Sequence, residues 1–463
     1  MPKCINRFSL KALTATVSAV VALGVVALPT ATHADETCNS PFTPLIKGQE
    51  DLVYVWTLGV EGVGDGSDKL VTVDVRPKSK TFGKVVASIS TGDRGEAHHT
   101  GFTDDRRYLW AGALDNNKIY IFDIHSNPAK PKLVKTISDF AEKTGYVGPH
   151  TFYALPGRMM IQALSNTRNH SGETGIAIYN NEGDMIGKHD MPTGMVNGVK
   201  ADGYGYDLGI NPQQNVLLTS SFTGWNNYMM DLGKMVKDPE AMKRFGNTMA
   251  IWDLKTMKPL KVFDVPGAPL EIRWSLKKGD NWAVTATALT SKLHVIKQDS
   301  KGEWQTYDVG TIGNPADIPL PVDISITKDG KGLWVNTFLD GMTRYWDFTN
   351  PMKPKEVYTK KMGSQVNMVS QSFDGKRVYF TTSLLGNWDK KGKDDEQWLK
   401  MYRWDGKQLK HAFTLDFYKE KLGRAHHMKF QAINLKTLQP LHAGLEGVDI
   451  LNKVALTKDL EGK

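Results

Sequence analysis

Short runs of β-branched and aromatic residues alternate along the chain with turns rich in Gly, Asp, Asn and Pro. Runs of this length, bounded by such turns, are typical of β-strands. Long amphipathic helices are nearly absent, and the stretch GKMVKDPEAMKRFG at 233–246 is the one clear helical candidate. The pattern therefore predicts a protein built mainly of β-strands.

Seven of the predicted strands share one pattern, in which an apolar run ends in an aromatic or apolar residue followed by Asp, Asn or a close analogue. They are LVTVDV, IYIFDI, IAIYNN, MAIWDL, LHVIKQ, MTRYWDF and KMYRWDG, spaced about 44 to 73 residues apart. Several follow a turn and a strand that complete a hairpin, as in DDRRYLWAGALDNNKIYIFDI. Repeated units of roughly 40–50 residues, each supplying part of a four-stranded antiparallel sheet, indicate a β-propeller. We predict an all-β fold, a single β-propeller of seven blades, with six or eight blades or a pair of β-sandwich domains as alternatives.

Residues 1–34 follow a different pattern from the rest of the chain. Three basic residues and no acidic one precede an apolar run from Leu13 to Leu28, and the small-residue site THA ends just before Asp35. This order is typical of a secretory signal peptide. An uncleaved membrane anchor is the alternative, but the run is short and rich in Ala, Thr and Ser. We therefore expect cleavage before Asp35, a propeller domain over 35–463 with no internal linker, and a periplasmic location.

Charge and cysteine content narrow the possible partners. The formal charge of +8 falls to about +5 without the three leader bases, because 55 basic and 50 acidic residues then remain. Basic residues are mixed with acidic ones rather than clustered, which argues against binding to nucleic acid. No later stretch is apolar enough to span a bilayer. Cys38 would be the only thiol left after cleavage, so we expect no internal disulfide and a fold stabilised by its core.

Two histidine doublets stand out, His98–His99 in GEAHHTGF and His426–His427 in RAHHMKF, together with His150 in GPHTF. Imidazole nitrogens suit copper and zinc. The five histidines fall at or near strand starts in different units, and inner propeller strands end near the central channel, so distant residues can converge there.

Adjacent residues on a regular strand face opposite sides, so both members of a doublet can bind one metal only where the backbone is irregular. We predict a metal site built from two to four of these imidazoles. Glu96, two residues before His98, is a candidate to orient one of the rings.

Eight strings in a fixed order carry a more specific signal. They are TVDVRPKSKTFGKV, GEAHHTGF, GYDLGINPQQNVLLTS, APLEIRW, VDISITKDGKGLWV, FLDGMTRYWDFTNPMKPK, FDGKRVYFTTSLLGNWDK and RAHHMKF. In this order the chain resembles the selenium-binding protein / methanethiol oxidase family, from about Cys38 to about Phe430. The resemblance implies a β-propeller and, as in bacterial members, an exported copper-dependent oxidase. Such an enzyme converts methanethiol, O2 and water to formaldehyde, hydrogen sulfide and hydrogen peroxide, so a small thiol and O2 are the implied substrates.

The resemblance also implies copper ligands. His98 and His99 match the family's acidic-x-His-His-(Ser/Thr)-Gly string, His150 matches a His-Thr position, and His426 matches the histidine of the terminal Ala-His string. His427 is a candidate through its position beside His426.

The chain departs from the family pattern in three places. Phe152 and Tyr153 stand where a second histidine usually follows the His-Thr pair, the C-terminal ending reads QAINLKTLQPLHAGLEG, and the family's additional cysteines are missing. Selenium binding through a thiol therefore has no support in this sequence.

The other polar candidates have structural interpretations. Single histidines on strands and turns are usually hydrogen-bonded residues rather than ligands; these are His125, His170, His189, His294, His411 and His442. Carboxylates and arginines within the family-like strings commonly tie propeller blades together; these are Asp207, Glu271, Arg273, Asp323 and Asp389.

Three functions remain open at this point. The first is a copper-dependent oxidase of small thiols, the second is an exported propeller that binds copper or a partner protein without turnover, and the third is a zinc hydrolase. The altered C-terminus and the missing second histidine favour the second. The third lacks an evident general base beside the histidines.

Overall fold

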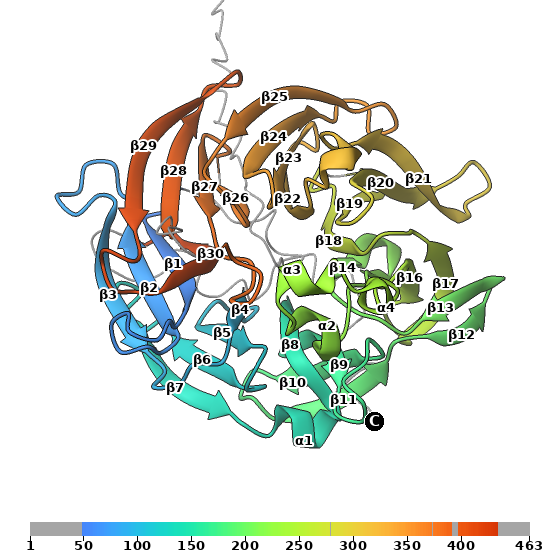
Figure 1. Cartoon of the computed structure of the whole chain (residues 1–463), viewed down its shortest axis with the longest axis horizontal. Coiled ribbons are helices and arrows are strands. Elements are labelled where there is room, and N and C mark those ends of the chain that lie inside the picture. The colour runs from blue at the N-terminus through green and yellow to red at the C-terminus, as the bar shows by residue number, and fades with distance from the viewer. Residues whose placement is uncertain (1–48, 278, 373, 391–396, 434–463) are drawn as a thin grey trace, which may run out of the picture. The chain divides into compact units, whose positions relative to one another are not determined.

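The computed structural model describes residues 49–277, 279–372, 374–390 and 397–433, which belong to one compact unit spanning Thr32–Lys463. In this part of the chain, seven four-stranded antiparallel sheets form the blades of a ring (Figure 1). The predicted seven-bladed β-propeller is thereby confirmed, and the pair of β-sandwiches is wrong. The expected leader, residues 1–34, and Cys38 lie outside the described residues.

Each blade runs from an inner strand to an outer strand. The inner strands are β4 (Ala97–Phe102), β8 (Tyr146–Leu155), β14 (Leu208–Asn211), β18 (Pro269–Trp274), β22 (Pro321–Ile326), β26 (Val369–Gln371) and β30 (Arg424–Gln431). The second strands are β5 (Tyr108–Ala113), β9 (Arg158–Asn166), β15 (Val216–Thr219), β19 (Trp282–Thr287), β23 (Gly332–Thr337), β27 (Arg377–Thr381) and β1 (Leu52–Leu58). The third strands are β6 (Ile119–Asp123), β10 (Gly175–Asn180), β16 (Thr248–Asp253), β20 (Lys292–Gln298), β24 (Met342–Asp347), β28 (Trp398–Trp404) and β2 (Lys69–Asp74). The outer strands are β7 (Lys132–Ile137), β11 (Met185–Asp190), β17 (Lys258–Asp264), β21 (Trp304–Thr311), β25 (Lys355–Lys361), β29 (Leu409–Asp416) and β3 (Lys84–Ser90).

The seven strings with a shared pattern prove to be the seven third strands. Inner strands such as β22 are buried along their whole length, whereas outer strands such as β11 alternate between half-buried and exposed residues. A strand with both faces covered must be apolar or internally paired, and a rim strand needs only one apolar face. The repeated pattern of the third strands was therefore easier to recognise in the sequence than the pattern of the inner strands.

Short elements connect the blades. They are the ribbon of β12 (Thr193–Val196) and β13 (Val199–Asp202), the helices α1 (Phe140–Thr144), α2 (Trp225–Tyr228), α3 (Leu232–Met235) and α4 (Pro239–Met242), and the 3-10 turns η2 (Pro212–Gln214) and η3 (Pro315–Asp317). The single helix predicted over 233–246 is wrong. Asp238 accepts a hydrogen bond from the Glu240 backbone N–H and Pro239 starts a new helix, so α3 and α4 are separate single turns. None of the helices in the described part of the chain is long and apolar enough to cross a membrane.

The ring closes in a blade that draws strands from both ends of the described chain. β30 pairs antiparallel with β1, and β2 and β3 complete that sheet. Arg377 of β27 strengthens this junction: its guanidinium donates hydrogen bonds to the backbone oxygens of Glu50 and Val75, and its Nε lies 2.6 Å from Glu50 Oε1. Tyr379 donates a further hydrogen bond to Glu50 Oε1 at 2.8 Å. The first strand of the ring is therefore held to the preceding blade by a buried ion pair.

Replacing Arg377 with Met should lower the free energy of unfolding by about 3–5 kcal/mol, because the buried Glu50 carboxylate would lose its positive partner. Chemical denaturation followed by tryptophan fluorescence measures this change. The double variant Arg377→Met/Glu50→Gln should recover part of the lost free energy of unfolding, because no unpaired charge is then buried. A single variant as stable as wild type would contradict the assigned role.

Candidate metal centre

Five of the seven inner strands are irregular at the level where the histidines occur. The pairing register shifts at this point in β4, β8, β18, β22 and β30, whereas β14 and β26 pair without a shift. A bulge leaves the extra residue unpaired and re-aims its side chain. The residues that the pairing skips are His98, His99, His150, Leu270, Glu271, Val322 and His426. The irregular backbone that both members of a doublet require is therefore present.

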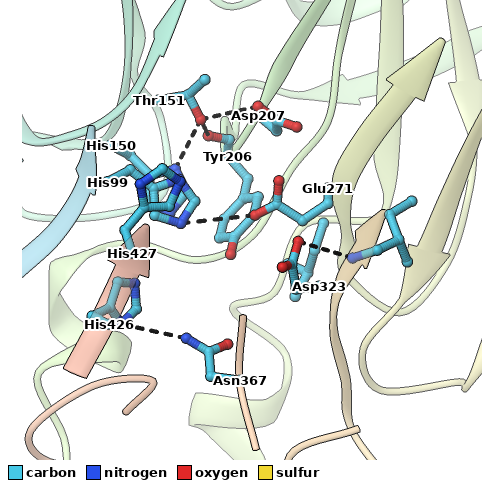
Figure 2. A network of polar contacts seen from close by, with 12 residues as sticks. His99, His150, Thr151, Tyr206, Asp207, Glu271, Asp323, Asn367, His426 and His427 are labelled. Atoms are coloured by element: carbon cyan, nitrogen blue, oxygen red, sulfur yellow. Dashed lines mark hydrogen bonds and ion pairs between the residues drawn. The ribbon is translucent and has the colours of Figure 1, made fainter. Parts of the chain in front are cut away.

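The bulges bring the five predicted histidines together from three blades. Figure 2 shows four of them, His99, His150, His426 and His427. All five side chains are buried, with no more than 2 % of any residue exposed. The ring centroids of His98 and His426 lie 4.1 Å apart, as do those of His99 and His150, and the His99 and His427 centroids are 4.7 Å apart. One ring nitrogen from each of His98, His99 and His150 lies within 4.8 Å of the other two, so these three residues could hold one metal ion.

Hydrogen bonds fix the proton on Nδ1 of two of these rings. His426 Nδ1 lies 2.7 Å from the carbonyl oxygen of Ser383, which can only accept. His150 Nδ1 lies 3.0 Å from the Thr151 hydroxyl, whose own proton goes to Asp207 Oδ1 or to the Tyr206 carbonyl. In both rings Nε2 therefore carries the lone pair.

The opposite ring nitrogens lack hydrogen-bond partners. His150 Nε2, His426 Nε2, His427 Nε2 and His98 Nδ1 are buried without one, and His427 is anchored through Nδ1 to the Thr100 hydroxyl at 2.8 Å. Leaving buried polar atoms unpaired costs free energy. A metal ion would satisfy several of them at once, and rings held through the distal nitrogen are typical of metal ligands. The residues present therefore fit a bound metal.

Burial also keeps the imidazoles neutral. It lowers the pKa of His426 to about 3 and the pKa values of the other four well below the usual range, and in each of those four neighbouring histidines add to the effect. Metal ligation needs neutral imidazole. The cluster can thus offer its lone pairs to a cation throughout the physiological pH range.

Glu271 faces the histidines, although the sequence suggested only a structural role for it. Its Oε1 lies 3.8 Å from His99 Nε2 and has no hydrogen-bond partner, while Oε2 accepts a hydrogen bond from Arg273 at 3.0 Å. Burial first, and then the nearby Asp207, raise the pKa of Glu271 well above its usual range. The sequence did contain an indication of the bulge that holds Glu271. Pro149, Pro269 and Pro321 each lie directly before a bulge, and proline within sheets favours such sites.

The other candidates from the family-like strings tie blades together, as expected. Asp207 Oδ2 accepts the backbone N–H of Ile272, and Asp323 Oδ2 accepts that of Val369 in the next inner strand. Arg273 bridges the two aspartates at 3.2 Å each. Between β27 and β28, Asp389 accepts hydrogen bonds from Arg424 of β30, from the Ser383 hydroxyl and from the Leu384 backbone.

Glu96 has a backbone partner, although its position two residues before His98 made it a candidate to orient a histidine ring. Its partner among the described residues is the backbone N–H of Gly386, at 2.8 Å from Oε1, rather than an imidazole. Desolvation raises its pKa to about 8. With φ at 63°, Glu96 also turns the chain sharply just before the doublet, so its visible contribution is to the course of the backbone.

The remaining histidines stay apart from the cluster. His189 and His411 lie on the outer strands β11 and β29, His294 lies on the third strand β20, His125 follows β6, and the His170 ring packs on Trp225. His442 and the C-terminal stretch from 434 lie outside the described residues.

The missing second histidine of the family pattern leaves the cluster intact. Phe152 and Tyr153 are buried in two different hydrophobic cores that β8 helps to form. The Tyr153 hydroxyl also donates a hydrogen bond to the Ile210 carbonyl. Both side chains serve packing between blades.

Comparisons with known proteins now separate the families that share this fold. The model of the 56 kDa selenium-binding protein family (SBP56) matches residues 32–434. The chain belongs to this family. It is 70 % identical over 413 residues to a methanethiol oxidase of Hyphomicrobium sp., covering 89 % of this chain and 94 % of that one. It is 58 % identical over 411 residues to a methanethiol oxidase of Ruegeria pomeroyi, covering 87 % and 94 %. The structure of a hypothetical selenium-binding protein from Sulfolobus tokodaii superimposes with a TM-score of 0.72 at 25 % identity, covering 88 % of this chain and 97 % of that one.

Glu271→Gln should weaken metal binding about 10- to 100-fold, because a bound cation would lower the raised pKa of this carboxyl group, and only Glu can then ionise and hold the ligating His99 ring. Metal retained after dialysis against a chelator of known affinity, measured by elemental analysis, gives the change. His411→Ala removes an imidazole outside the cluster and should leave retention unchanged. Equal retention by Glu271→Gln and wild type would refute the role assigned to this carboxylate.

Proposed function

We propose that this protein is a copper-dependent oxidase of small thiols that acts on methanethiol in the manner of its bacterial relatives. The observation that carries the proposal is the buried cluster of five neutral histidines, in which His98, His150, His426 and His427 each have a ring nitrogen without a hydrogen-bond partner. The 70 % identity to a protein named methanethiol oxidase supports the choice of substrate. The products implied by the family are formaldehyde, hydrogen sulfide and hydrogen peroxide.

The donor set supports copper as the metal. Imidazoles without thiolates suit copper or zinc, and the described part of the chain contains no cysteine. Amino-acid side chains cannot hand electrons to O2, so oxidation of a thiol requires a redox centre, and copper would supply one-electron chemistry and a lower thiol pKa. Zinc would fit the rings but not the reaction.

The residues around the cluster have defined tasks in this proposal. His150 and His426 present lone pairs in fixed orientations, because the Thr151 hydroxyl and the Ser383 carbonyl hold their Nδ1 protons. Glu271 can ionise next to His99 when a bound cation lowers its raised pKa, and Arg273 holds its second oxygen. Burial strengthens each of these interactions, since water does not screen them.

We expect near-stoichiometric copper, with nitrogen couplings in the electron paramagnetic resonance spectrum, in wild-type protein purified from the exported fraction. His98→Ala/His99→Ala should lose the copper and the thiol-dependent production of peroxide, because two of the three closest donors are gone. His411→Ala serves again as the matched control.

Two other outcomes have defined meanings. Copper bound without thiol-dependent peroxide would leave a non-catalytic copper-binding propeller. Redox-silent zinc in place of copper would refute the oxidase and favour hydrolytic chemistry.

The proposal includes export to the periplasm. Its support is the pattern of residues 1–34 and the family match, which begins at residue 32, after the apolar run. Mass spectrometry of the protein from a periplasmic extract should give a mature chain that begins at Asp35. A chain that retains residues 1–34 would contradict cleavage.

A further inference from the structure

An apolar cavity of about 130 Å³ adjoins the histidine cluster. His98 and Tyr206 belong to its lining, and the Tyr206 ring lies 4.1 Å from the His150 ring, so the cavity lies next to the cluster. Apart from these two residues and Trp388, the lining consists of Ala, Val, Leu, Ile, Met and Phe side chains. No charged residue takes part in this lining among the residues that the structure describes.

Both the bulges and an insertion build the walls. Leu270 and Val322, which the strand pairing skips as it skips the histidines, line the cavity. The segment between β15 and β16 carries α2–α4 and covers the same space through residues such as Met235 and Phe245, and α3 lies near the centre of the ring in Figure 1. The same backbone device therefore shapes the metal cluster and the apolar space beside it.

The cavity reaches the surface at two exposed apolar residues. Val236, after α3, and Ile318, after η3, are each 49 % exposed and belong to the lining. Ile318 and Leu320 have φ values of 46° and 60°, which are costly for side chains of this size and typical of functional segments. Held in this way, the loop keeps apolar side chains at the mouth.

We infer that this cavity binds the alkyl group of the substrate and restricts it to uncharged thiols of one to three carbons. This inference rests on the proposed function and adds the substrate class. A dry apolar cavity of about 150 Å³ accepts benzene or xenon, so a space of 130 Å³ is large enough for a short alkyl chain.

Charge excludes the common biological thiols. Cysteine and glutathione would have to bury ammonium and carboxylate groups against a lining without a charged partner, which is strongly unfavourable. The sulfur of a neutral thiol would approach the wall that contains His98, whose Nδ1 has no hydrogen-bond partner. The cavity therefore selects for small, neutral and apolar substrates.

Two substitutions change its size in opposite directions. Ala288→Leu fills the space, and Leu289→Ala, at a partly buried position of the same lining, enlarges it. The matched control is Leu260→Ala, at a leucine on β17 that is 46 % exposed. None of the three residues neighbours a histidine of the cluster in the sequence. The copper content of the three variants should therefore be unchanged.

The selectivity is the ratio of kcat/KM for 1-propanethiol to that for methanethiol. Leu289→Ala should raise it about tenfold and Ala288→Leu should lower it by a similar factor, as small changes in apolar pockets do. Wild type should oxidise cysteine at least about 100-fold less efficiently than methanethiol. Ratios that do not move in either variant, or equal use of cysteine, would overturn the inference even if methanethiol is oxidised.

A binding measurement separates this inference from the proposed function. Dimethyl sulfide has the heavy atoms of ethanethiol without the S–H group, and saturation-transfer NMR detects its binding to metal-free protein. Wild type and Leu260→Ala should show the transfer, and Ala288→Leu should lose it while keeping its thermal transition. If no thiol is oxidised, the proposed function fails, and this binding alone decides: transfer lost in Ala288→Leu supports an apolar ligand site, and no transfer in wild type refutes it.

Discussion

The bulges in the inner strands are the constraint on which the site depends. A regular strand would send His98 and His99 to opposite faces, and the buried inner strands leave little freedom to adjust. Skipping both residues in the pairing with β5 lets their rings stack at 4.8 Å. The same irregularity places His150 and His426 beside them, so the cluster results from repeated local departures from sheet geometry in a rigid ring.

Such an arrangement is costly and must be supported elsewhere. Five neutral imidazoles and the Glu271 carboxyl group lie in a region where unpaired polar atoms are unfavourable. The ring offsets this by joining neighbouring inner strands through Asp207 and Asp323, each of which accepts a backbone N–H from the next blade. Rigid support of this kind is what a preorganised site needs, because ligands that shift by an ångström lose much of their effect.

Much of this organisation was predictable from the sequence, and the reason lies in its repetition. The third strands repeat a visible pattern, so the number of blades followed from counting, and the rarity of histidine drew attention to the two doublets. The position of Glu271 beside His99 was not predicted, because it depends on which residue a bulge omits, and strand register is a property of two strands rather than of one string. The contact of Glu96 with Gly386 could not be predicted either, since sequence proximity to His98 says nothing about the direction of its side chain. The cavity could not be foreseen, because it combines residues from several blades and an insertion.

The closing blade determines when, during synthesis of the polypeptide, the histidine cluster can assemble. His426 and His427 lie on β30, the last strand of the ring, while His98 and His99 lie on β4, near its beginning. A nascent chain that has emerged only as far as the sixth blade already contains the first three donors but not the last two. Assembly of the complete cluster therefore waits for the end of synthesis, and a prematurely terminated chain lacks both an intact ring and a full set of donors. Assembly of the five-histidine cluster is thereby coupled to completion of the polypeptide.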